Sequence, residues 1–290
     1  MTVIIRTNTD VTDPNAPIYV RDQLLADSND GVRFLFDYGR PYSWPNQDDP
    51  INGDGARDIS NHANAAWTIT SGSPDFDPED GGMDFSTVTT QPANLVVPAA
   101  SFAADIFADQ LFLVAMYLKL PSAAQWPADA SGYRYFMCGT LGSSSVVTSG
   151  EADIVSIGMW TNGSTHYLVA HRQKNGTVVD TLFIDMAGQF EAVGQLGFWR
   201  SATQQGLRWK SAAGTVLYTL SASTKNVTNF SSKTLQVGLP NTFWGLSDAG
   251  HRASSHYRMF RHFGENLARS GRDPVTVLDA DYARNIGRFA

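Results

Sequence analysis

Two acidic residues, Glu151 and Asp153, stand two positions apart in the segment GEADIVSIGMW. Side chains alternate along a β-strand, so a strand places both carboxylates on one face. Such a pair could serve glycoside hydrolysis, which needs two carboxyl groups about 5.5 Å apart when the sugar configuration is retained. The two positions where a further catalytic acid could follow carry Val155 and Ser156. The catalytic pattern is therefore incomplete, and a solvated strand edge is the competing interpretation.

Oxygen-rich side chains gather in two other segments, NQDDPINGDGARD and SPDFDPEDGG. Carboxylate and amide oxygens are hard ligands that suit calcium. Neither segment has the spacing of the 12-residue calcium loop, so a solvated turn is the competing interpretation. The candidate calcium ligands lie in the first segment: Asp48, Asp49, Asn52, Asp54 and Asp58.

The seven tryptophans fall into two groups according to their neighbours in the chain. Trp67, Trp199 and Trp209 stand in strand-like segments and are expected in or on the core. The other four stand in or beside segments with Pro, Asn and Gly, where an exposed ring could stack on a sugar or contact a protein. Core or subunit contact competes with sugar contact at these positions. The candidate carbohydrate-binding residues are Trp44, Trp126, Trp160 and Trp244.

Composition and charge exclude several classes of partner. The 290-residue chain has a net charge of -7 and no basic stripe that could neutralise phosphates, so nucleic acid is not an expected partner. The longest apolar run, residues 111–118, is too short to cross a bilayer, and no membrane insertion is expected. The start of the chain, MTVIIRTNTD, lacks the apolar core of a signal peptide, which predicts folding in the cytosol. Cys138 is the single cysteine and is expected to be buried and inert.

Short apolar segments separated by turn residues follow one another from Gly31 onward. Their density predicts an all-β domain, built as a two-sheet antiparallel sandwich. One hairpin is expected to pair residues 166–173 with residues 177–185 about Asn175-Gly176, because this dipeptide suits a type I′ turn. A second hairpin is expected to turn at Ala213-Gly214.

The two ends of the chain differ from this pattern. Residues 1–30 have little alternation and are predicted to form an extended N-terminal arm for attachment. Residues 272–290 predict a short C-terminal helix, because Asp273 can cap it and apolar residues follow at helical spacing. The sandwich itself is assigned to residues 31–271.

Four segments resemble the concanavalin A-like and laminin G-like jelly-roll superfamily. DISNHANAAW, residues 58–67, is similar to the opening D-x-S-G-x-G-N-H motif of the family, with Asn61 where the family has glycine. GGMDFS, residues 81–86, resembles the strand that follows, LFLVAMYLKL, residues 111–120, resembles a later strand, and HYRMFRHFGENLARSGRDP resembles the closing strand. The resemblance implies a jelly-roll sandwich.

The same order of segments is similar to sandwich modules of tailed-bacteriophage virion proteins, a group with tail-fibre, baseplate and capsid-decoration components. This resemblance implies a non-enzymatic structural protein of the virion, which forms a homo-oligomer and docks to other virion structural proteins. The alternative is a lectin-like carbohydrate-binding module that recognises a host surface glycan, with calcium as its one candidate cofactor. Some hydrolases of the superfamily carry E-x-D-x-x-E on one strand. A polysaccharide hydrolase, with Asp180 or Asp185 completing the pair, is the third hypothesis.

Overall fold

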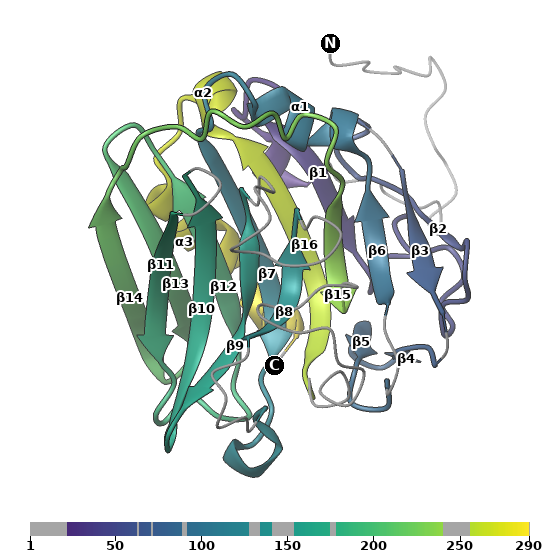
Figure 1. Ribbon diagram of the computed structural model, residues 1–290. Helices are drawn as coiled ribbons and strands as arrows, with labels where there is room; N and C mark the ends of the chain where they lie inside the picture. Colours follow the sequence, from purple (N-terminus) through teal and green to yellow (C-terminus); the bar gives the residue numbers. More distant parts are fainter. Residues whose placement is uncertain are drawn as a thin grey trace, which may run out of the picture.

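Alternating apolar residues build two antiparallel β-sheets that pack face to face (Figure 1). In the part of the chain that the structure describes, each sheet has eight strands. The predicted all-β, two-sheet jelly-roll sandwich with a short C-terminal helix is therefore confirmed. The computed structural model describes residues 22–62, 64–70, 72–88, 92–127, 134–140, 154–174, 178–239 and 256–289.

The first sheet, sheet A, has the strand order β14-β13-β12-β7-β16-β5-β4, and β1 also pairs with β16. One edge of β16 pairs with β7, and the other pairs with β1 and then with β5. The strands are β1 (Val32–Asp37), β4 (Asp75–Asp77), β5 (Gly82–Asp84), β7 (Phe112–Lys119), β12 (Val193–Arg200), β13 (Gln204–Ser211), β14 (Gly214–Ser221) and β16 (Arg258–Asn266).

The second sheet, sheet B, has the order β11-β10-β9-β8-β15-β6-β3-β2. Its strands are β2 (Gly55–Ala56), β3 (Ala65–Ile69), β6 (Ala93–Val97), β8 (Arg134–Gly139), β9 (Ser156–Asn162), β10 (Thr165–Gln173), β11 (Val179–Asp185) and β15 (Leu235–Leu239). The remaining elements are the helices α1 (Ala103–Ile106), α2 (Leu267–Ser270) and α3 (Pro274–Asn285), with single 3-10 turns η1 (Gln23–Leu25), η2 (Ala99–Ser101), η3 (Ala123–Gln125) and η5 (Ile286–Arg288).

Strand β7 shows why some strands are apolar throughout while others alternate. Phe112, Val114 and Met116 belong to the core between the sheets, whereas Leu113 and Ala115 belong to a second apolar cluster on the outer face of sheet A. A strand that is buried on both faces needs apolar residues at every position. The outer face of sheet A is therefore covered by other parts of the chain.

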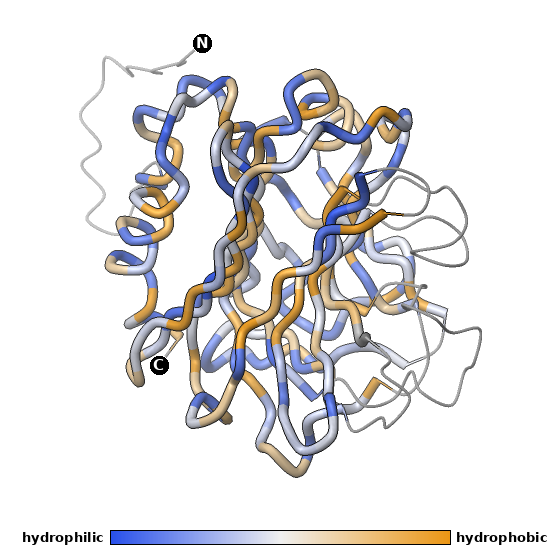
Figure 2. The backbone as a smooth tube through the Cα atoms, turned by 60° about the vertical axis from the view of Figure 1, so that its left-hand side comes forward, coloured by the Kyte–Doolittle hydropathy of each residue, from blue (hydrophilic) through white to orange (hydrophobic). Residues whose placement is uncertain are grey.

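The cover consists of the terminal segments. Helix α3 lies on the face of sheet A that is turned away from sheet B (Figure 2), and its Leu278 packs against Gly197 of β12. As predicted, the Asp273 side chain caps this helix by accepting from Thr276 N at 2.8 Å. Leu24 of η1 is buried in the same cluster. Residues 22–30, which the sequence assigned to the attachment arm, thus pack on the sandwich, and residues 1–21 lie outside the described part.

A buried ionic cluster joins these terminal segments to sheet A. The Arg261 side chain of β16 is fully buried and contacts three carboxylates, Asp22 at 2.8 Å, Asp37 at 3.3 Å and Asp281 at 3.1 Å. Arg288 also bonds to Asp37, at 2.8 Å. Burial alone would raise the pKa of Asp22, but the charge of Arg261 more than offsets it, and the pKa lies below its ordinary value. The cluster links the start and end of the described chain.

The structure corrects three details of the predicted strands. The acidic segments treated as loops contain the short strands β2 and β4. In the second hairpin Ser211 pairs with Gly214, so the turn falls at residues 212–213 rather than at Ala213-Gly214. In the first hairpin Gln173 pairs with Val179. A two-residue turn at Asn175-Gly176 would pair Gln173 with Val178, so the register differs from the predicted one by one residue. The antiparallel pairing of both hairpins is confirmed.

Candidate functional site

The outer face of sheet B carries a row of aromatic side chains on three neighbouring strands. Trp160 of β9 lies directly opposite Tyr167 of β10, and their rings stack with centroids 5.1 Å apart and planes at 27°. Phe183 of β11 meets Tyr167 edge to face, with centroids 5.5 Å apart. Leu168 and Leu182, the neighbours of these residues in the chain, point into the core. The period-2 alternation of strands therefore turns the aromatic rings outward.

The row continues across the side of the sandwich onto sheet A. The ring of Phe183 stacks on Tyr218 of β14, with centroids 5.3 Å apart and planes at 22°. Phe183 is 38% exposed, and Trp160, Tyr167 and Tyr218 are half-buried. We call these four residues the aromatic row. Rings that brace one another in this way form a stiff surface whose ordering costs little on binding.

A short turn and an exposed carboxylate complete this site. Asn162 pairs with Thr165, and the intervening Gly163 has a φ of +63°, a conformation that glycine adopts without strain. This turn sets the register that places Trp160 against Tyr167. Asp185 of β11 lies opposite Tyr167 and is exposed. One of its oxygens accepts from Ala187 N at 2.9 Å.

The structure separates the four candidate tryptophans. Trp160 lies in the aromatic row, and Trp244 lies outside the described residues. Trp44 is fully buried and donates through Nε1 to the carbonyl of Asp48 at 3.0 Å. Trp126 is 2% exposed and donates to the carbonyl of Trp160 at 3.3 Å. Core contact, the alternative to sugar contact, is therefore the role of Trp44 and Trp126, because both loops fold back and pack their rings into the core.

The remaining tryptophans agree with the sequence interpretation. Trp67 and Trp209 are buried between the sheets, and Trp199 is buried beneath helix α3 on the outer face of sheet A. Sequence inspection missed Tyr167, Phe183 and Tyr218 as candidate site residues. Strand alternation was the signal for Tyr167 and Phe183, because Leu168 and Leu182 beside them point into the core. Tyr218 gives no such signal, because its neighbours Leu217 and Thr219 are exposed.

The five candidate calcium ligands have other roles in the structure. Asp58 is buried, and its carboxylate accepts from Leu35 N, Ser60 N and His62 N at 2.8, 2.8 and 2.9 Å. Among the described residues no group of three or more His, Cys, Asp or Glu side chains could hold a metal ion. Calcium binding by this loop stays a prediction. The other four side chains each accept a backbone N–H: Asp48 from Asp49, Asp49 from Phe76, Asn52 from Ile69 and Asp54 from Ile51.

Of the carboxylates considered for hydrolysis, Glu151 and Asp153 lie outside the described residues. Of the two residues proposed to complete the pair, Asp185 is exposed beside the aromatic row. The other, Asp180, contacts Arg172 at 3.0 Å and Lys174 at 2.7 Å. Burial raises the pKa of Asp180. Hydrogen bonds from Lys174, Ser223 and Gln205 and the charge of Arg172 lower it by a larger amount, so the pKa lies below its ordinary value. A general acid needs a raised pKa, and Asp180 therefore has the character of a structural ion-pair partner.

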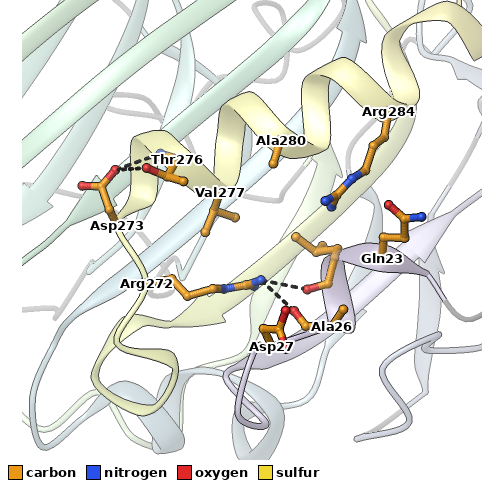
Figure 3. A pocket seen from close by; sticks show the side chains of 10 residues that line it. Gln23, Ala26, Asp27, Arg272, Asp273, Thr276, Val277, Ala280 and Arg284 are labelled. Atoms are coloured by element: carbon orange, nitrogen blue, oxygen red, sulfur yellow. Dashed lines mark hydrogen bonds between the residues drawn. The ribbon is translucent and has the colours of Figure 1, made fainter.

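A groove of about 320 Å³ lies between η1 and helix α3 (Figure 3). Leu24 and Val277 line it, together with the polar side chains of Arg272 and Asp273. Arg272 donates to Glu265 at 2.9 and 2.6 Å and to the carbonyl of Leu24 at 3.1 Å. Asp273 is used as the helix cap. These polar groups hold the terminal segments on sheet A, so the aromatic row is the stronger candidate for ligand binding.

Comparisons with known proteins bear on the fold. No protein-family model matches the sequence, and no curated protein matches it. None of the described helices is long and apolar enough to cross a membrane. A search of solved structures, in contrast, finds chains of similar architecture.

The binding domain of botulinum neurotoxin serotype C1 has a TM-score of 0.57 and 12% identity, with 88% of this chain and 53% of that chain covered. The chain thus spans about half the length of the toxin domain. The CBM2 module of the evolved Dit of Lactobacillus casei BL23 phage J-1 has a TM-score of 0.39 and 11% identity, covering 81% and 95% of the two chains. The lectin UEA-II complexed with galactose has a TM-score of 0.38 and 10% identity, covering 80% and 97%. At such identities the likeness to the toxin domain shows the fold alone, a two-sheet β-sandwich.

Proposed function

We propose that the chain is a non-catalytic carbohydrate-binding module that holds a glycan on the aromatic row. The observation that carries this proposal is the juxtaposition of Trp160, Tyr167 and Phe183 with the exposed carboxylate of Asp185. Aromatic rings offer apolar area to the C–H faces of a sugar, and a carboxylate accepts hydrogen bonds from its hydroxyls. The combination supplies both kinds of contact on one surface.

The virion hypothesis enters this proposal as a biological setting. A module that binds glycans would serve host recognition if it belonged to a tailed-phage particle, as the sequence resemblance implies. Its docking to other virion structural proteins through the terminal helix finds less support, because Val277 and Leu278 of α3 are already buried against sheet A. Attachment would then depend on residues 1–21 or on another surface.

A glycan array probed with the labelled full-length chain tests the proposal. We expect binding to a defined class of glycans, and we expect Phe183→Ala and Trp160→Ala each to weaken it at least tenfold, which corresponds to about 1.4 kcal/mol. Tyr42→Ala is the matched control, because Tyr42 is also exposed, at 47%, and lies outside the aromatic row. Circular dichroism and thermal unfolding would show that the variants fold.

The outcomes separate the hypotheses. Absence of binding to every glycan, with calcium and with a chelator, would contradict the proposed function. Binding that survives both substitutions in the aromatic row would place the site elsewhere. Binding that needs calcium would in addition support the metal prediction for the loop that contains Asp48 and Asp54. Release of reducing sugar from a polysaccharide would support the hydrolase hypothesis instead.

A further inference from the structure

The strands at the ends of the two strand orders, β4 and β14 in sheet A and β2 and β11 in sheet B, are protected to very different degrees as edges. An edge strand presents unpaired N–H and C=O groups, and natural sheets block such pairing with short strands, charges or proline. Strands β2 and β4 are two and three residues long, and β4 has aspartate at both ends. Strand β11 has seven residues and contains Asp180 and Asp185. Strand β14, at the left-hand edge of the sandwich in Figure 1, has eight residues with no charge and no proline.

The hairpin geometry identifies the backbone groups that β14 leaves open. Ser211 and Gly214 close the two-residue turn and therefore exchange hydrogen bonds with each other. Every second residue along β14 then bonds to β13, and the intervening residues direct their N–H and C=O groups away from the sheet. These outward residues are Thr215, Leu217, Thr219 and Ser221.

The side chains near this edge are also unusually apolar for a surface. Leu217 of β14 is 50% exposed, and Val178, which precedes β11 at the adjacent edge of sheet B, is 43% exposed. These are two of the six large apolar side chains that are exposed among the described residues. Exposed apolar side chains beside an open strand edge indicate a surface that is covered by a partner.

We propose that the partner is a second copy of this chain, which pairs its own β14 antiparallel to the first. A two-fold axis at Tyr218 sets Val216 of one copy opposite Leu220 of the other, and Leu217 opposite Thr219. The apolar side chains of Val216 and Leu220 therefore meet, and the outward backbone groups of Leu217 and Thr219 are in register to bond to each other. An uncharged edge also lets two copies with a net charge of -7 approach without bringing like charges together. The eight-stranded sheet A becomes continuous across both copies.

Light scattering after size-exclusion chromatography of the full-length chain, at a series of protein concentrations, tests this inference. We expect twice the chain mass of 31.6 kDa. Leu217→Lys, which places a charge on the edge, and Thr219→Pro, which removes an outward N–H, should each return the protein to the mass of one chain. Ile51→Lys is the matched control, because Ile51 is 66% exposed on another surface, and it should remain dimeric.

Two results of light scattering would overturn the inference. One is a wild-type protein with the mass of a single chain at all concentrations, and the other is a dimer that persists in both edge variants. Hydrogen exchange gives an independent readout, because the amides of Leu217 and Thr219 should exchange slowly in the wild-type dimer and quickly in Leu217→Lys. Slow exchange only in the presence of a different protein would assign the edge to a foreign strand and would also overturn the proposal. None of these results depends on glycan binding.

Discussion

Removal of Arg261 should strongly destabilise the fold, because this side chain is the shared cation of three buried carboxylates. Arg261 is 0% exposed, and Asp22, Asp37 and Asp281 all lie within 3.3 Å of its guanidinium nitrogens. Arg40 and Arg288 contribute two more cations, so the cluster is balanced at three charges of each sign. Arg261→Met leaves one buried negative charge without compensation.

The expected cost follows from the burial of this cluster. Removing one partner of a buried ion pair costs about 3–5 kcal/mol. Unfolding entropy near 60 °C is roughly 2.1 cal/mol/K per residue, or about 0.6 kcal/mol/K for a chain of 290 residues. Thermal unfolding of Arg261→Met at pH 7 should therefore show a Tm about 5–8 °C below that of the wild type.

The matched control is Lys225→Met. Lys225 pairs with Asp109 at 3.8 Å, and both side chains are more than half exposed. An exposed pair of this kind contributes about 0–1 kcal/mol, so the control should unfold close to the wild type. A loss in Arg261→Met no larger than that of the control would refute the view that the cluster holds the terminal segments on sheet A.

Acid should reduce the difference in the free energy of unfolding between the wild type and Arg261→Met. Because the folded-state pKa of Asp22 is below its unfolded value of 3.8, the stabilisation from this group is present above pH 3.8 and is lost as the pH falls through the folded-state pKa. Chemical unfolding at pH 7 and near pH 3 measures the change. An equal difference at both values would mean that the carboxylates are not responsible.

Two further predictions concern buried side chains. Burial and the charge of Arg261 lower the pKa of His262 to about 3, and neither ring nitrogen has a hydrogen-bond partner among the described residues; His262→Leu should therefore raise the free energy of unfolding by about 1 kcal/mol, and a lower stability in urea titration would show that the ring is needed. Burial raises the pKa of the Cys138 thiol. The folded protein should therefore resist iodoacetamide, while the denatured chain takes up one equivalent. Mass spectrometry measures the uptake, and alkylation of the folded protein would contradict the prediction.

The strand pattern predicted the fold well because most strands alternate or are continuously apolar, and burial depends on those two patterns. The two missed strands, Gly55–Ala56 and Asp75–Asp77, are too short to show a pattern, and neighbouring strands define them. Asp58 resembled a metal ligand in the sequence, yet its oxygens satisfy backbone donors that only the folded loop brings near.

The candidate site was harder to predict because it depends on which residues stand opposite one another. A two-residue turn at Asn175-Gly176 would set Tyr167 opposite Ile184, which points into the core. In the structure Lys174 N donates to Val178 O, and Tyr167 faces Asp185. A shift of one residue changes every cross-strand neighbour. The sequence left core contact and sugar contact open at Trp44 and Trp126 for a related reason, since loop composition does not reveal whether a loop folds back over the core.

Strand β1 has a consequence for the order in which the chain can fold. Its partner in sheet A is β16, and the contact between Asp37 and Arg261 spans 224 positions of the sequence. During synthesis Asp37 of β1 therefore leaves the ribosome 224 residues before Arg261 of β16. Leu35 and Leu113, which are buried in the finished sheet, would be exposed throughout that interval. We therefore expect slow folding and a nascent chain that engages chaperones.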